Sequence, residues 1–167
     1  GGSYNDHNPN DFLYKSLLLN WQNSMMPDYV KMKAPEIENL PSDIDALSAY
    51  ISGISYKTNQ YCWATIKSCA ITKLKGLEDE QEKWVYKFVA VAEDTYKEMS
   101  AQQCANWLER TRTVPSFFSN SAIQRYQAVK TLVETRLHAS RVEGLIAMYD
   151  ALTESEKQAF KNYLIHR

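Results

Sequence analysis

The sequence predicts an all-α fold, a single compact domain of about six to eight helices with orthogonal or bundle-like packing. Only 5 of the 167 residues are glycine, and no Asn-Gly or Asp-Gly pair separates alternating apolar runs as in a β-hairpin. The apolar content of 44% is enough to bury the core of one domain of this length. We assign residues 11–167 to this domain, because residues 1–10 have the look of a cloning remnant followed by a flexible leader.

Two helices are predicted in the N-terminal part of the chain. The first starts at Asn8, with Pro9 in the first turn where its missing N–H costs nothing, and it ends before Pro27. Its apolar residues share one helical face: Tyr14, Leu17, Leu18, Trp21 and Met25. A second helix begins after Ser42, whose hydroxyl can cap it, and Asp45 three residues later completes a capping box.

The second helix is expected to bend near Gly53 or Asn59 and to end at Gly76, because an unbroken helix of that length is uncommon in a globular domain. Residues 54–74 are rich in Thr, Ile, Tyr and Cys, so an alternating strand is the competing interpretation. A third helix is predicted over 78–99, since its acidic first turn complements the positive end of the helix dipole.

Capping boxes predict the remaining helices. Ser100 with Gln103 starts a short helix that ends before Pro115. Three more boxes precede apolar-periodic runs: Ser121 with Gln124, Ser140 with Glu143, and Thr153 with Glu156. They predict three separate helices, at 122–138, 141–151 and 154–166.

The chain offers no residue pattern typical of catalysis or of metal binding, so we predict neither an enzyme nor a cofactor or metal. Closely spaced Cys or His pairs, nucleophile elbows and phosphate-binding glycine loops are missing from the sequence. His138 follows Glu134 by one helical turn, and we interpret them as a solvated surface pair rather than a general base.

The three cysteines indicate a reducing compartment. Their odd number suits free thiols better than a disulfide framework, and we expect Cys62 and Cys69 to be buried in the core. The longest uncharged stretch, 58–66, is too short and too polar to span a bilayer. These observations predict a cytoplasmic protein that makes no membrane contact.

Charge is distributed unevenly along a nearly neutral chain. The net charge is −1, which excludes a surface given over entirely to nucleic acid or anionic lipid. All six arginines follow residue 109, however, and residues 110–141 hold six cations against one anion, Glu134. Arginine suits carboxylates and phosphates, and aromatic residues lie nearby. We therefore predict a binding surface around residues 107–141, made of Trp107, Arg110, Arg112, Phe117, Phe118, Arg125, Arg136 and Arg141.

A structural role for the same side chains is the competing interpretation. Arg125 and Arg136 lie three helical turns apart at the edge of an apolar stripe, where they could pair with acids of a neighbouring helix such as those of 78–82. Phe117 and Phe118 could form a plug that packs into the core instead of an exposed pair. Arg110 and Arg112, just before this loop, are then the best candidates for partner contacts.

The function predicted is that of a non-enzymatic protein–protein interaction module, a regulator, adaptor or inhibitor. Its partner would be another protein, with an acidic one favoured by the arginines, and a homodimer is compatible with the same surface. The alternative is a nucleic-acid-binding regulator that uses the basic segment 110–141 together with the C-terminal helix pair. Glu154 and Glu156 weigh against it, because a recognition helix would place them against phosphates.

Overall fold

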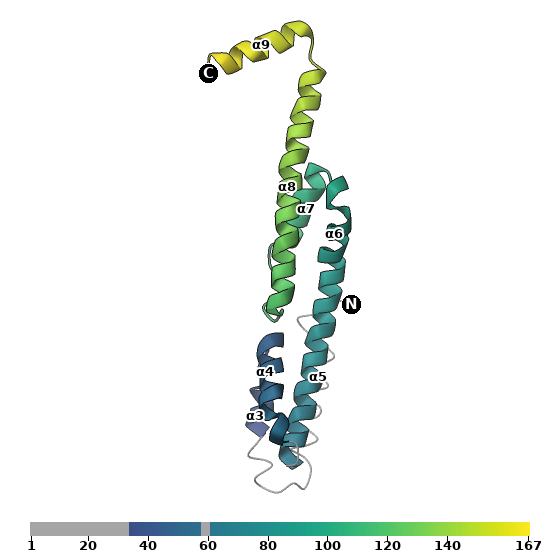
Figure 1. Ribbon diagram of the computed structural model, residues 1–167, viewed down its shortest axis with the longest axis vertical. Helices are drawn as coiled ribbons and strands as arrows, with labels where there is room; N and C mark the ends of the chain where they lie inside the picture. Colours follow the sequence, from purple (N-terminus) through teal and green to yellow (C-terminus); the bar gives the residue numbers. More distant parts are fainter. Residues whose placement is uncertain (1–33, 58–60) are drawn as a thin grey trace. The chain divides into compact units, whose positions relative to one another are not determined.

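Every regular element of the described chain is helical. The computed structural model describes residues 34–57 and 61–167, and within them it contains helices and no strand (Figure 1). The predicted all-α class is confirmed, and the strand interpretation of 54–74 is wrong. The helix predicted between Asn8 and Pro27 and the bend considered at Asn59 lie outside the described residues.

The contacts divide the chain into two compact units. The first unit holds the described residues up to Lys87 together with Val114–Arg125, and the second holds Phe88–Thr113 together with Tyr126–Arg167. Two helical runs continue along the chain from one unit into the other. The prediction of a single domain over 11–167 stays a prediction.

In the first unit, α4 and α5 lie side by side around an apolar core (Figure 1). The helices of this unit are α3 (Ala34–Glu38), α4 (Ile44–Ile54), a 3₁₀ turn (Ser55–Lys57) and α5 (Tyr61–Trp84). The core residues are spaced at helical intervals, which is why these segments become helices that bury one face. They are Ile37, Leu40, Leu47, Ile54, Trp63, Ile66, Cys69 and Ala70.

Two boundaries in this unit differ from the prediction. The N-cap of α4 is Asp43, whose carboxylate accepts from the backbone N–H of Ala46, so Ser42 is not the cap. Gly76 does not end α5, because one internal glycine costs only about 1 kcal/mol in helix propensity and Leu77 continues to pack against the core. The helix predicted over 78–99 is therefore not separate: residues 78–84 are the end of α5, and the rest continues as a π-helical stretch (Val85–Ala90), α6 (Val91–Thr95) and a 3₁₀ turn (Tyr96–Glu98).

Two helix N-termini of the first unit are tied together by reciprocal hydrogen bonds. The N–H of Ile44, at the start of α4, donates to the carbonyl of Phe117 at 3.0 Å. The N–H of Asn120, at the start of α8, donates to the carboxylate of Asp45 at 2.7 Å. Both N–H groups lack a partner within their own helix. Asp45 thus holds the loop before α8, which is a different role from the capping-box role predicted for it.

The second unit contains the irregular end of the long α5 run and the C-terminal helices. Two elements are shared with the first unit, a π-helical stretch (Val85–Ala90) and α8 (Asn120–Asp150), and the others are α6 (Val91–Thr95), a 3₁₀ turn (Tyr96–Glu98), α7 (Ala101–Arg110) and α9 (Glu154–Ile165). The capping boxes of Ser100 and Thr153 are both present, with side chain and backbone bonded reciprocally, so these two predictions are confirmed.

Helix α8 runs unbroken for 31 residues, so the separate helices predicted at 122–138 and 141–151 are one. The Ser140 capping box does not form. The Ser140 hydroxyl donates instead to the backbone carbonyl of Met99 at 3.2 Å, and the backbone stays helical through it. Nor does Ser121 cap the start of α8, where the Ser119 hydroxyl accepts from the N–H of Ala122.

Aromatic side chains satisfy backbone carbonyls at two irregular points of the second unit. The Trp107 indole donates to the Phe88 carbonyl in the π-helical stretch at 2.9 Å, where the α-helical hydrogen-bond pattern is interrupted. The Tyr126 hydroxyl donates at 2.7 Å to the carbonyl of Thr111, a fully buried residue that ends α7. The Trp107 and Tyr126 rings stack with centroids 6.0 Å apart. Ring packing and hydrogen bonding therefore both hold α7 against α8.

We expect Tyr126→Phe to lower the free energy of unfolding by about 1–2 kcal/mol, because it leaves the buried Thr111 carbonyl without its donor while keeping the ring. Chemical denaturation followed by circular dichroism measures this. Tyr86→Phe is the matched control, because Tyr86 is 72% exposed, and it should change stability by less than about 0.5 kcal/mol. Equal stability of the two variants would contradict the assigned role of the hydroxyl.

Candidate interaction surface

The structure divides the predicted arginine and aromatic residues between the two units. Phe117, Phe118 and Arg125 belong to the first unit, and the second contains Trp107, Arg110, Arg112, Arg136 and Arg141. Neither unit alone holds the whole of the surface expected around residues 107–141.

The aromatic members of that set pack inward. Phe118 is 4% exposed and meets Trp84 edge-on, with ring centroids 5.2 Å apart, while Phe117 packs against Phe118 at 5.3 Å. Trp107 is 9% exposed and its indole hydrogen is engaged by a backbone carbonyl. The loop pair thus has the geometry of a plug in the core, and in this structure neither Phe118 nor Trp107 is accessible to a partner.

Four of the five predicted arginines are exposed, whereas Arg136 is partly buried. Arg110 and Arg112 are exposed at the end of α7, the first over the Phe88 ring at 5.3 Å and the second 3.7 Å from the carboxylate of Glu109. Such a surface ion pair contributes little to stability. Arg125 lines a groove of about 460 Å³ together with Glu78 and Glu82, the acids expected to face it. Arg141 is exposed on α8.

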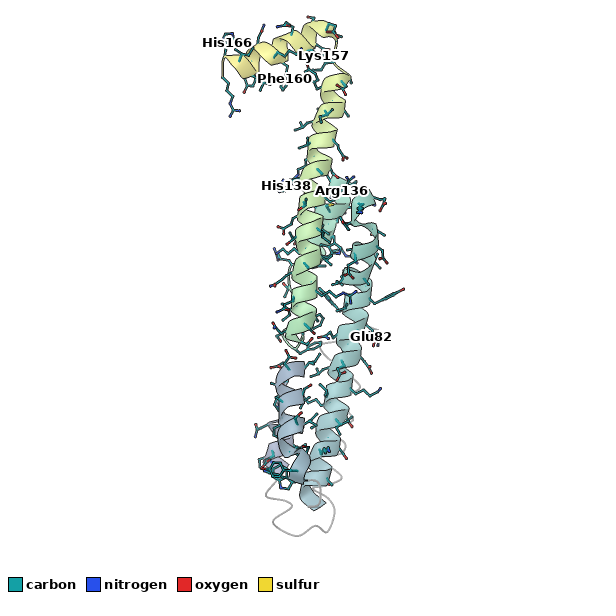
Figure 2. The ribbon with its side chains drawn as sticks, viewed as in Figure 1. Glu82, Arg136, His138, Lys157, Phe160 and His166 are labelled. Carbon is teal, nitrogen blue, oxygen red and sulfur yellow. The ribbon has the colours of Figure 1, made fainter. Side chains whose placement is uncertain are left out.

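Arg136 has a structural environment. Arg136 projects from α8 (Figure 2). Its Nε–H donates to the Met99 carbonyl at 2.9 Å, and its guanidinium lies 3.2 Å from the carboxylate of Glu143. The side chain is 23% exposed, whereas that of Glu143 is 62% exposed. Arg136 and Ser140 thus both donate to Met99, at the junction that precedes α7. This environment agrees with the core-flanking interpretation of Arg136.

Beyond Ser140, α8 exposes its apolar side chains. Residues 141–148 are all exposed, and α9 turns away from the axis of α8 within the second unit (Figure 1). Large apolar residues between 45% and 73% exposed occupy both helices. We call them the C-terminal apolar surface: Val142, Leu145, Ile146, Met148, Phe160, Tyr163, Leu164 and Ile165.

A groove lies where α8 and α9 meet. It has a volume of about 480 Å³ and an almost wholly apolar lining, formed by Val142, Leu145, Ile146, Met148, Tyr149, Leu152 and Phe160. Phe160 lies on the side of α9 that faces α8 (Figure 2), and its ring centroid is 5.9 Å from that of Tyr149. Lys157 lies over the Tyr149 ring at 5.6 Å, so one edge of the groove carries a cation.

The sequence contains a signal for this surface in its helical periodicity. Helical periodicity placed Leu145 and Ile146 on one stripe and Phe160 and Leu164 on another. Periodicity reports that a face is apolar, and the same pattern results whether the face is covered within the chain or by another molecule. Only the position of α9 in the structure shows that this apolar face is left exposed.

Reactive groups are scarce in the part of the chain that the structure describes. It contains no cluster of three or more His, Cys, Asp or Glu side chains that could hold a metal. Glu134 and His138 are both exposed on α8. Cys69 and Cys104 are buried free thiols, and burial raises the pKa of Cys69 to about 11. Burial also raises the pKa of Cys104, although the nearby charge of Arg136 partly opposes it.

Among residues 34–57 and 61–167, no helix combines the length and the apolar character needed to cross a membrane. Comparison with protein-family models, with curated proteins and with solved structures finds no significant match.

We expect Cys69 and Cys104 to resist a thiol-specific disulfide reagent at pH 8 in the folded protein. A pKa near 11 for Cys69 leaves about one thousandth of it as thiolate at that pH, and both side chains are buried. The experiment uses Cys62→Ser, which removes the third cysteine. Unfolding in guanidinium should release both thiols, and rapid reaction of either one in the folded state would indicate an accessible, reactive cysteine.

We expect Arg136→Ala to lower the free energy of unfolding by about 1–3 kcal/mol, because the Met99 carbonyl loses a charged donor. Arg141→Ala removes the same side chain from an exposed site five residues later on α8 and should stay within about 0.5 kcal/mol of wild type. Thermal and denaturant unfolding measure both. Unchanged stability of Arg136→Ala would remove the structural role and restore Arg136 as a binding candidate.

Proposed function

We propose that this chain is a non-enzymatic protein–protein interaction module, a regulator, adaptor or inhibitor, and that it binds through the C-terminal apolar surface. The observation that carries the proposal is the exposure of eight large apolar side chains on α8 and α9. A reducing intracellular compartment belongs to the same proposal, since Cys69 and Cys104 are free thiols.

The size of the surface supports this function. At roughly 100 Å² for each partly exposed side chain, the eight residues present on the order of 800 Å² of apolar area. The largest apolar patch on a typical monomeric protein is about 300–600 Å². Leaving this area in water is unfavourable by roughly 25 cal/mol per Å², which a partner recovers on binding. Five of the eight residues line one groove, and exposed apolar area gathered in this way is typical of a binding site: Val142, Leu145, Ile146, Met148 and Phe160.

The exposed Arg141 adds a charged edge to the proposed binding surface. Arg141 immediately precedes Val142 on α8 and is exposed, so it borders the C-terminal apolar surface. A polar or charged rim around an apolar centre is the usual composition of a protein interface. Residues 141–167 contain four cations and four anions, a balance that favours a protein partner over nucleic acid.

The proposal is tested by immobilising the full chain and measuring which proteins it retains from a native extract treated with nuclease. The variant Leu145→Asp with Ile146→Asp places two charges in the groove, and Ala128→Asp is the control at an exposed position of α8. We expect specific partners on wild type and control and at least a tenfold loss on the double variant, because burying a charge opposes binding.

Circular dichroism establishes that both variants keep the helical fold. Identical retention by all three proteins would show that the C-terminal apolar surface is not the binding site. Retention that disappears on nuclease treatment would favour the nucleic-acid alternative instead.

A further inference from the structure

We infer that the C-terminal apolar surface binds a second copy of this chain, forming a two-fold symmetric dimer through α8 and α9. The inference rests on the proposed function and names the partner. In this arrangement the last turn of α9, with Tyr163, Leu164 and Ile165, lies in the groove between α8 and α9 of the other copy. Two-fold symmetry makes the contact reciprocal, so each copy gives one helix end and receives one.

The exposed area matches what a dimer needs. A stable interface of standard size buries about 800 Å² on each partner, and the eight residues of the C-terminal apolar surface expose an area of that order. Different residues of the C-terminal apolar surface supply the groove and the apolar side chains available to fill it. Leu145 and Ile146 line the groove, whereas Leu164 and Ile165, 52% and 73% exposed, lie outside it. Each copy therefore offers both an apolar groove and exposed apolar side chains outside it.

The charges of α9 are complementary in the same arrangement. Its first turn is acidic, with Glu154 and Glu156, and its basic residues Lys157 and Lys161 are followed by Arg167. Placing the end of one α9 beside the start of the other makes the two helices antiparallel. Lys161 and Arg167 of each chain then lie toward the acidic first turn of its partner's α9, and the helix dipoles are opposed favourably. A partner of strong net charge would not match this balanced surface.

Sedimentation velocity on the full chain over a range of concentrations tests the inference. We expect a species of twice the 19.3 kDa chain mass for wild type and for Ala128→Asp. Leu145→Asp with Leu164→Asp should be monomeric, with a dissociation constant raised at least a hundredfold, because each interface would bury four charges.

Charge reversal provides a second, milder test at exposed positions. Glu154→Lys alone and Lys161→Glu alone should each weaken the dimer on the order of tenfold, since both symmetric contacts become repulsive. Mixing the two variants should restore association close to that of wild type, because a reversed charge on one chain would then face an opposite charge on the other in both contacts. Neither change touches the capping box of Thr153 and Glu156.

A wild-type chain that stays monomeric at every concentration overturns the inference, as does a dimer that Leu145→Asp with Leu164→Asp leaves intact. Failure to recover association in the mixture overturns the antiparallel arrangement. A monomer that still retains a foreign protein through Leu145 and Ile146 refutes the dimer and leaves the proposed function standing. A monomer that retains nothing refutes both.

Discussion

The second unit depends on one backbone carbonyl, that of Met99. It accepts hydrogen bonds from the Arg136 guanidinium and from the Ser140 hydroxyl, and it lies where the 3₁₀ turn ends and α7 is about to begin. These two bonds fix the position along α8 beside which α7 begins. Because α7 runs from there toward Thr111, whose carbonyl is bound by Tyr126, it covers only the part of α8 before Ser140. The next eight residues of α8 are exposed as a result.

The same constraint explains why the aromatic residues are structural. A π-helical stretch interrupts the regular α-helical hydrogen bonding, and a helix end leaves carbonyls unpaired. A buried acceptor without a donor costs about 1–3 kcal/mol. Trp107 supplies the donor for Phe88 and Tyr126 supplies it for Thr111. A side chain held by such a bond and by ring packing is not available to a partner. Under the proposed function, docking uses exposed apolar side chains such as Leu145 and Ile165 instead.

The proposed function follows from this difference between the aromatic side chains, which are bonded within the chain, and the exposed apolar side chains. Arginine and aromatic content led us to residues 107–141 as the binding region, and there Arg136 and Trp107 have partners inside the second unit. The C-terminal helices have the opposite character, with balanced charge and apolar side chains such as Leu145 and Ile165 in solvent. Apolar area provides binding free energy, while the balanced charges of α9 provide orientation. A second copy of the chain meets both requirements at once.

The sequence by itself determined the all-α class and those helix starts that depend on a local reciprocal bond, at Ser100 and Thr153. A capping box involves four consecutive residues, so no distant contact is needed to recognise it. The tertiary structure determined which of the predicted helix ends occur. Helix α5 passes through Gly76, and Ser140 donates to Met99 without ending α8. It also decided which apolar stripes are covered. Helical periodicity is a property of one segment, whereas burial depends on whether a second segment covers it, and residues 141–148 of α8 stay exposed.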